Sequence, residues 1–209
     1  MRRTDRDRDI LVTLATRLRF LALRQVASWW QSPSAAQSAR RRLAQLEAEG
    51  MVVLSRVHAE PLLELRAPIV AWIPGHPAPD FRAVSNTLNS RWPVVAPAAL
   101  MVYRASRTTN NRFGGPGRLA PLSADQITHD LHVSEVYVQL RRTDPATASA
   151  WIGEDVLGKA GYRMKDPDAI VRRPDGSDIA IEFGGRYDKQ RVEEFHQDCE
   201  RRNRPYELW

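Results

Sequence analysis

Residues 31–56 read QSPSAAQSARRRLAQLEAEGMVVLSR, and their pattern predicts the fold of the first half of the chain. Ser34 follows a proline that ends the preceding helix, and a serine hydroxyl can cap the next helix by accepting a backbone N–H bond. Ala39, Leu43 and Leu46 recur at helical spacing and predict the core-facing stripe of that next helix. A glycine is a suitable C-terminal stop and closes the helical pattern.

Two further apolar patterns precede this stretch and predict helices over residues 5–20 and 23–30. Three short helices with a tight turn before the third form a helix-turn-helix. The segments MVVLSRV and LLELRAPIVAWIPG then flank a connection that contains proline, which predicts a β-hairpin with Arg56 near its tip. We therefore expect a winged helix-turn-helix.

Charge supports a nucleic-acid-binding role for this half. Residues 1–92 contain 14 basic and 8 acidic residues, so they hold the whole +6 net charge of the chain. Side chains that could reach phosphates or base edges are Ser34, Gln37, Ser38, Arg40, Arg41, Arg42 and Arg56. Two other interpretations stay open, namely arginines that only solvate the surface and a three-helix cluster used for dimerisation.

The middle of the chain is predicted as a helix over residues 79–92, which closes the first domain or forms a dimer contact, and a linker over 93–122. The expected domains are thus 1–92 and 123–209. A capping-box pattern at Ser123 predicts a helix to about residue 142. This helix carries His129, Asp130, His132 and Glu135, residue types that can bind a metal ion. The sequence shows no further set of ligands that would complete such a site.

The second half is predicted as helix, hairpin, helix and strand. The helices cover residues 146–159 and 188–202, and the hairpin strands begin at Asp168 and end at Glu182. An antiparallel hairpin brings the start of one strand beside the end of the next, so these two carboxylates should be neighbours. Glu182 stands among apolar residues, where an acid needs a metal, a base or a hydrogen-bond donor.

This arrangement resembles the PD-(D/E)xK nuclease superfamily in Pro167-Asp168 and in Glu182. The resemblance implies a small restriction-endonuclease-like α/β domain in which Asp168 and Glu182 hold Mg²⁺ and Glu154 completes the site. Gly184 occupies the position of the superfamily's lysine, and Lys189 on the next helix is the substitute within reach. The resemblance therefore implies either a degenerate site or a Mg²⁺-dependent DNA nuclease that uses Glu154, Asp168, Glu182 and Lys189.

The whole chain is similar to the replication-relaxation family of plasmids and other mobile elements. The matching motifs are Thr128-His129-Asp130-Leu131, Trp151-Ile152-Gly153-Glu154, Pro167-Asp168-Ala169 and Ile181-Glu182. The family usually has a second acid two residues after the strand glutamate, and in this sequence Gly184 occupies that position. The resemblance implies a DNA-associated protein that acts in replication, relaxation or transcriptional control of mobile DNA.

Composition excludes several classes of protein. The chain has 209 residues and 43% hydrophobic residues, which is typical of globular domains. No apolar run reaches about 18 residues, so no membrane span is expected. The N-terminus lacks a secretory signal, and the single cysteine fits reducing cytoplasm.

We therefore expect an α+β protein of the cytoplasm that binds double-stranded DNA. DNA binding itself needs no cofactor, and Mg²⁺ enters only if the second half is a nuclease. A homodimer is one expected partnership, with the nuclease-like half serving interaction or dimerisation. The alternative to a regulator or nuclease is an adaptor that binds a replication protein, relaxase or effector in a larger complex.

Overall fold

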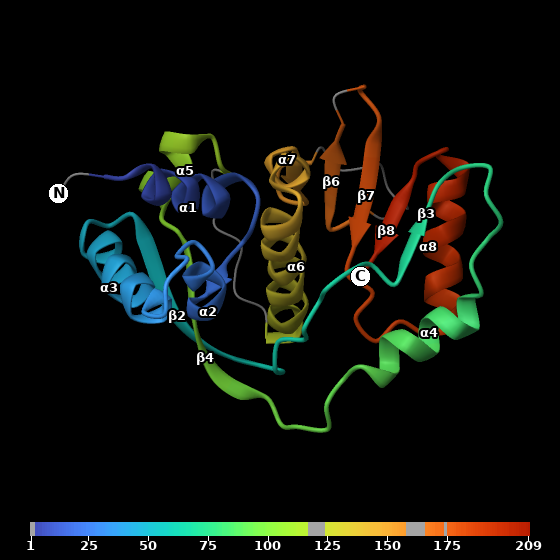
Figure 1. The fold of residues 1–209 in the computed structure, drawn as a ribbon, viewed down its shortest axis with the longest axis horizontal. Helices are drawn as coiled ribbons and strands as arrows, with labels where there is room; N and C mark the ends of the chain where they lie inside the picture. Colours follow the sequence, from blue (N-terminus) through green and yellow to red (C-terminus); the bar gives the residue numbers. More distant parts are fainter. Residues whose placement is uncertain (1–2, 117–123, 158–165, 174) are drawn as a thin grey trace. The chain divides into compact units, whose positions relative to one another are not determined.

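The structure is a computed structural model that describes residues 3–116, 124–157, 166–173 and 175–209. The chain divides into two compact units, and each unit is assembled from two separate stretches. Unit 1 comprises Met1–Pro61 and Ala96–Val138, and unit 2 comprises Leu62–Val95 and Gln139–Trp209. Helices accompany two sheets, which confirms the α+β class (Figure 1).

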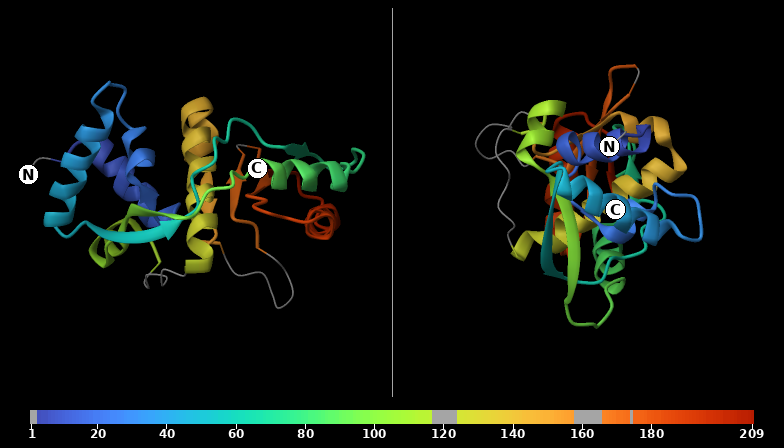
Figure 2. Two further views of the ribbon diagram at one scale, coloured as in Figure 1. Left: turned by 90° about the horizontal axis from the view of Figure 1, so that it is seen from below. Right: turned by 90° about the vertical axis from the view of Figure 1, so that its left-hand side faces the viewer.

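Unit 1 combines helices with a three-stranded sheet. Its elements are α1 (Asp5–Thr16), β1 (Leu21–Ala22), α2 (Leu23–Ala27), α3 (Ala35–Ala48), β2 (Val52–Ala59), β4 (Ala98–Ala105), α5 (Arg107–Phe113) and the larger part of α6 (Ala124–Thr143). The sheet order is β1-β4-β2 and both pairings are antiparallel. Every residue of β2 pairs with β4, and the two strands form a long ribbon (Figure 2).

The expected hairpin after α3 is wrong in its second strand. The sequence predicted that residues 62–75 would pair with β2, but β4 does so, from Val52 opposite Ala105 to Ala59 opposite Ala98. The expected linker over 93–122 is wrong where β4 and α5 lie, because β4 is the central strand of the sheet. Ser123 and its expected cap lie outside the described residues.

Unit 2 is built on a five-stranded sheet with the order β3-β8-β7-β6-β5. Its elements are β3 (Val70–Trp72), α4 (Phe81–Ser90), α7 (Pro145–Ser149), β5 (Trp151–Gly153), β6 (Ala169–Arg172), β7 (Asp178–Glu182), α8 (Lys189–Arg201) and β8 (Tyr206–Leu208). Strands β5, β6 and β7 are antiparallel neighbours, and β8 returns through α8 to run parallel to β7. Strand β3 pairs antiparallel with β8.

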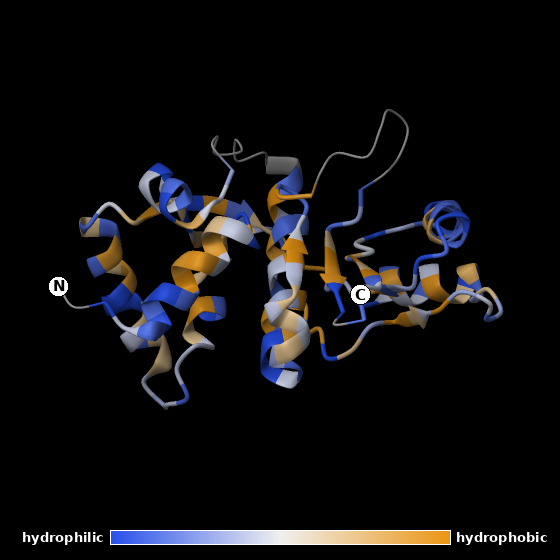
Figure 3. Cartoon of the chain, turned by 90° about the horizontal axis from the view of Figure 1, so that it is seen from above, coloured by the Kyte–Doolittle hydropathy of each residue, from blue (hydrophilic) through white to orange (hydrophobic). Residues whose placement is uncertain are grey.

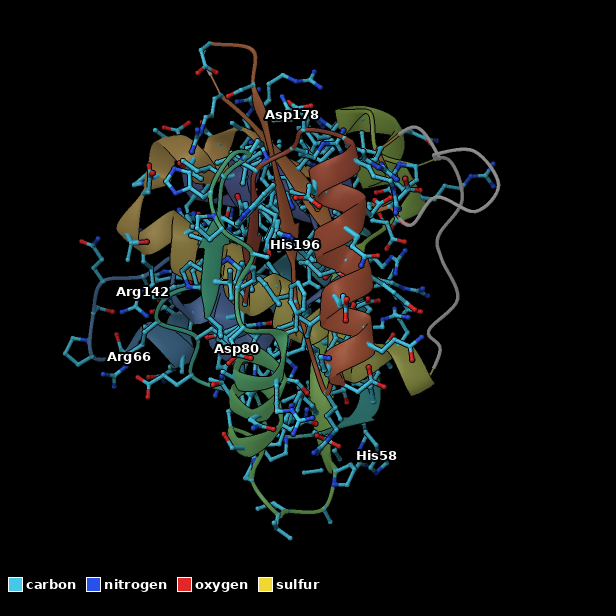
Figure 4. The ribbon with its side chains drawn as sticks, turned by 90° about the vertical axis from the view of Figure 1, so that its right-hand side faces the viewer. His58, Arg66, Asp80, Arg142, Asp178 and His196 are labelled. Carbon is cyan, nitrogen blue, oxygen red and sulfur yellow. The ribbon has the colours of Figure 1, made fainter. Side chains whose placement is uncertain are left out.

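Helices α4 and α8 cover one face of this sheet. Leu88 of α4 and Val192 of α8 are buried in one apolar cluster with Ala180 and Leu208 of the strands. Helix α8 is otherwise hydrophilic, whereas the strands are mostly hydrophobic (Figure 3). His196 lies on the side of α8 that faces β3 and β8 (Figure 4), and burial lowers its pKa. The helix expected over 79–92 is therefore present, but it packs in unit 2 and does not close unit 1.

The helix expected over 146–159 is wrong beyond its first turn. Helix α7 ends at Ser149, and Trp151–Gly153 forms β5, where Trp151 is buried opposite Val171 of β6. Pairing with the sheet overrides the local helical pattern. None of the helices in the described part of the chain is long and apolar enough to cross a membrane.

Candidate functional site

Helix α3 presents a polar side to solvent. Its buried residues are the predicted stripe Ala39, Leu43 and Leu46, which hold the helix against the core. Gln37, Arg40 and Arg41 are exposed, and Ser38 is half-buried. Helical periodicity therefore separates an apolar inner side from an outer side with two cationic side chains and one amide.

Arg42 does not belong to that outer surface. Its Nε donates to Asp7 Oδ1 at 2.6 Å, and its Nη2 pairs with the other oxygen of the same carboxylate. Asp7 is only 1% exposed and also accepts hydrogen bonds from the backbone N–H and the hydroxyl of Thr4. The pair joins α3 to α1, so the prediction of a DNA-contacting Arg42 gives way to a structural role.

The protonation of Asp7 reflects this network. Burial alone would raise the pKa of the Asp7 carboxyl, but the hydrogen bonds from Arg42 and Thr4 outweigh burial and lower it below 3.8. The carboxylate raises the pKa of Arg42 in return. The pair is thus a doubly hydrogen-bonded contact between two charges with little solvent around the acid.

Ser34 does not cap α3 as the sequence predicted. It occupies the position before the helix, but its side chain accepts no hydrogen bond from the helix backbone. Its backbone angles, φ −92° and ψ 17°, differ from the extended conformation that normally aims a capping hydroxyl at the helix. Its Oγ lies 3.4 Å from Ser32 Oγ, at the exposed start of α3.

Arg56 lies in the middle of β2, opposite Met101, and not at the tip of a wing. The expected tip position is wrong because the chain leaves β2 for unit 2 and returns as β4. Arg56 and Met101 are both exposed. Two residues along the ribbon, on the same face, Tyr103 pairs with Leu54.

Tyr103 connects this ribbon face to α3. Burial raises the pKa of Tyr103, nearby Glu47 raises it further, and Arg40 acts in the opposite direction. Helix α3 packs against β2 of the same ribbon. Arg40 on α3 and Arg56 on β2 are thus both exposed cations of unit 1.

The two acids of unit 2 are neighbours, as the hairpin register predicted. Ala169 pairs with Ile181, so Asp168 and Glu182 stand opposite each other at the next position. The backbone N–H of Asp168 donates to Glu182 Oε2 at 3.3 Å, and Asp168 Oδ2 accepts from the backbone N–H of Phe183 at 2.7 Å. Each carboxylate thus binds the backbone of the opposite strand.

Glu182 is fully buried and binds Tyr187. The Tyr187 hydroxyl donates to Glu182 Oε1. Burial raises the pKa of Tyr187 strongly, and the negative charges of Glu182 and Asp168 raise it further, so the phenol keeps the proton that it donates. The Arg191 guanidinium lies 4.8 Å from the centre of the Tyr187 ring. Glu182, the acid in the apolar strand, therefore has the Tyr187 hydroxyl as its hydrogen-bond donor.

The position at which the nuclease resemblance implies a lysine is closed by packing. A Cβ on Gly184 would lie 2.7 Å from Leu88 Cδ2 and 3.2 Å from Leu208 Cδ1. Leu88 is completely buried and comes from α4. A lysine at residue 184 would therefore need the space that α4 occupies.

The two remaining acid and base candidates lie at the surface. Lys189 is exposed on the first turn of α8. Glu154 follows β5, not a helix, and is exposed, while its backbone N–H donates to the carbonyl oxygen of Asp168 at 3.0 Å. The structure thus brings Asp168 and Glu182 together and binds the backbone of Glu154 to that of Asp168.

These residues do not fit the Mg²⁺ centre that the resemblance implies. Mg²⁺ prefers six oxygen ligands, and no group of three metal-ligating side chains occurs in the described part of the chain. Three of the four carboxylate oxygens of the pair already accept hydrogen bonds from Asp168, Phe183 and Tyr187. The pair therefore links β6 to β7 and, through Tyr187, to the turn before α8 by hydrogen bonds.

We expect Mg²⁺ in excess to leave the thermal unfolding midpoint of the protein unchanged relative to EDTA. If the folded protein bound Mg²⁺, an ion concentration 100 times the dissociation constant would add about 2.7 kcal/mol to the stability of the folded state. Differential scanning fluorimetry in Mg²⁺ and in EDTA measures the difference. A Mg²⁺-dependent rise in the unfolding midpoint that disappears in Glu182→Gln would contradict the structural role of the pair and support a metal site.

The histidine and acids of α6 also serve the framework of unit 1. Asp130 pairs with Arg19, with both carboxylate oxygens 3.3 Å from Nη1. Glu135 accepts a hydrogen bond from Gln25 Nε2 at 2.9 Å, and His132 Nδ1 lies 2.6 Å from the carbonyl oxygen of Thr128. Asp130, His132 and Glu135, three of the four residues of the cluster, thus make hydrogen bonds within unit 1.

Sequence reasoning missed Asp7 and Tyr187. Asp7 stands three residues after Thr4, a capping-box spacing that could have marked it as a helix-start residue. Tyr187 carried no signal, because its bond to Glu182 depends on the turn between β7 and α8. No family model matches the chain, and comparison with curated proteins and with solved structures gives no significant match.

Proposed function

We propose that unit 1 is a winged-helix module that binds double-stranded DNA with α3 in the major groove. The order of α1, β1, α2, α3, β2 and β4, with the sheet order β1-β4-β2, supports this proposal. A helix after a short turn, backed by two others, is the arrangement that inserts into a groove. The departure is the wing, since the loop between its strands is replaced by the excursion into unit 2.

The observation that carries the proposal is the exposed polar side of α3. Gln37 and Arg41 lie one helical turn apart in the first half of the helix, and amide and guanidinium groups are those that read adenine and guanine edges. Arg40 on α3 and Arg56 on β2 are further exposed cations of unit 1, and they would contact phosphates. Glu47 and Glu49 keep the other end of the helix acidic, so the N-terminal half approaches DNA.

Unit 2 is proposed to be a degenerate nuclease-like domain used for interaction or dimerisation. The antiparallel β5-β6-β7 meander followed by α8 and a parallel β8 supports the likeness to a nuclease core. The closed space at Gly184 and the hydrogen-bonded Glu182 favour loss of hydrolysis over an active enzyme. DNA binding then requires no cofactor.

The biological setting that we propose is mobile DNA. It rests on the resemblance of four short motifs to those of the replication-relaxation family, and one of these motifs includes Asp130, the partner of Arg19. Plasmid replication, relaxation or transcriptional control would each use a site-specific binder, acting as a homodimer or with a replication, relaxase or effector protein. An adaptor role would show weak DNA binding and stable copurification with such a protein.

The triple variant Arg40→Gln/Arg41→Gln/Arg56→Gln tests the interface. After selection of a preferred duplex from a random pool, we expect the slope of log affinity against log salt to fall by about 2 units, about 0.9 for each of the two phosphates that Arg40 and Arg56 would neutralise. A matched control, Arg66→Gln/Arg82→Gln/Arg201→Gln, removes the same charge from exposed positions of unit 2.

Base reading is tested separately with Gln37→Ala. The variant should lose about 1–3 kcal/mol of discrimination at one position of the preferred site and keep the salt dependence of the wild type. Fluorescence anisotropy with a panel of single-base substitutions measures both. Binding of the triple variant that equals that of its control would remove α3 and the ribbon as the DNA-reading surface.

A further inference from the structure

A second cationic surface lies in unit 2, at the turn from β7 into α8. The segment 183–192 reads FGGRYDKQRV and holds three cations, Arg186, Lys189 and Arg191, against one anion, Asp188. All three cations are exposed. We name this segment, together with Arg91 and Trp92 packed against it, the β7–α8 corner.

Aromatic rings hold the arginines of the corner. The Arg186 guanidinium lies 4.6 Å from the centre of the Trp92 ring, and Arg191 lies 4.8 Å from that of Tyr187. A guanidinium held over an aromatic ring has fewer accessible orientations, and its planar set of N–H donors suits bidentate contact with phosphate oxygens. Trp92 is itself held, because its Nε1 donates to the carbonyl oxygen of Gly185 at 3.1 Å.

Arg91 adds positive charge beneath this surface. Its guanidinium lies 4.8 Å from the centre of the Phe183 ring, and Nη2 donates to the carbonyl oxygen of Trp209 at 3.0 Å. Its Nε is buried without a hydrogen-bond partner among the described residues. Burial lowers the pKa of Arg91 only to about 10, so the group is charged at neutral pH.

Three acidic residues lie near these cations, and two of them, Asp188 and Glu194, are exposed. Asp188 caps α8 by accepting a hydrogen bond from the Arg191 backbone N–H at 2.8 Å. Glu182 is buried and bound by Tyr187, and Glu194 lies one turn beyond Arg191 on α8. The outer surface therefore presents more cationic than anionic groups.

We propose that the β7–α8 corner binds the phosphodiester backbone of DNA through Arg186, Lys189 and Arg191, without a metal ion. The choice of ligand rests on the proposed DNA-binding function of unit 1. The cations are spread along a turn and the first turn of a helix and do not converge on a small pocket, which suits a polymer of phosphates better than a free anion. The corner would add sequence-independent contacts to those that α3 makes.

The test compares the salt dependence of DNA binding by full-length variants in EDTA. Arg186→Gln/Lys189→Gln/Arg191→Gln is expected to lower the slope of log affinity against log salt by about 2–3 units. The control Arg66→Gln/Arg82→Gln/Arg201→Gln removes equal charge and should change the slope by less than about one unit. Circular dichroism melting verifies that each variant is folded.

Each outcome separates this proposal from the function proposed for unit 1. Equal slopes for the corner variant and its control overturn the corner, whatever the α3 variant does. A loss confined to the corner variant supports the corner and contradicts DNA binding by α3. A loss in both supports both. Arg186→Lys/Arg191→Lys keeps the charge of the corner and should retain the wild-type slope. A wild-type slope that is smaller in EDTA than in Mg²⁺ would overturn the proposal that the corner binds DNA without a metal ion.

Discussion

Asp7→Ala is expected to lower the free energy of opening of α1 and α3 by about 3–5 kcal/mol, because it leaves the Arg42 guanidinium half-buried without its carboxylate. Hydrogen–deuterium exchange of the α1 and α3 amides measures this loss within unit 1. Asp5→Ala is the matched control, since Asp5 lies in the same helical turn and is exposed.

A second substitution identifies the cause of the loss. Arg42→Met in the Asp7→Ala background removes the unpaired charge and should restore part of the protection, as apolar side chains often replace buried ion pairs without cost. Protection in Asp7→Ala equal to that in Asp5→Ala would show that the ion pair does not hold α3 in place.

The contribution of Asp7 should depend on pH in one direction. The folded state holds the pKa of Asp7 below its ordinary value of 3.8, so the stabilisation is complete above that value and is lost as the pH falls through the lowered pKa. The stability difference between wild type and Asp7→Ala should therefore be constant near neutrality and shrink in acid. A difference that grew in acid would contradict the lowered pKa.

Leu88→Ala is expected to destabilise unit 2 by about 2–5 kcal/mol, because it opens a cavity where Leu88 closes the space over Gly184. Gly184→Ala alone should cost about 1–3 kcal/mol, since its Cβ would meet the leucine side chain. The double variant should be more stable than the sum of the two losses predicts, because each change makes room for the other.

Urea denaturation of the four proteins measures this double-mutant cycle. Val94→Ala serves as the control for truncation of an aliphatic residue, since Val94 is fully exposed in the same unit and its loss should fall within about 0.5 kcal/mol. Strict additivity of the two losses would show that Leu88 does not compete for the position of the superfamily's lysine.

Local pattern predicted those parts of the protein that depend on neighbours in the sequence. The stripe of Ala39, Leu43 and Leu46 is buried as helical spacing requires, and the hairpin register brought Asp168 beside Glu182. Both features are set by a single helix or a single tight turn, so the periodicity of a short segment contains enough information to define them.

Pairings across long distances could not be predicted in this way. Strand β4 begins at Ala98, directly after a Pro-rich stretch with the composition of a linker, and its partner β2 ends far earlier in the chain, at Ala59. Strand β5 likewise interrupts a helical pattern because Trp151 finds a place against β6. Arg42 looked like its neighbours Arg40 and Arg41, and only the position of Asp7 in space separates it from them.

Residues 62–95 belong to unit 2 but lie between the two stretches of unit 1 in the sequence. This arrangement also determines the order in which the parts of the protein can fold during synthesis. Strand β3 leaves the ribosome long before its partner β8, and α4 must wait for the α8 residues that cover its apolar side. Unit 1 can close once residues up to 138 have emerged, with an unfolded loop extruded from its ribbon. Nascent chains would therefore pass through a stage in which Leu88 and Trp72, both buried in the complete unit, are exposed to chaperones.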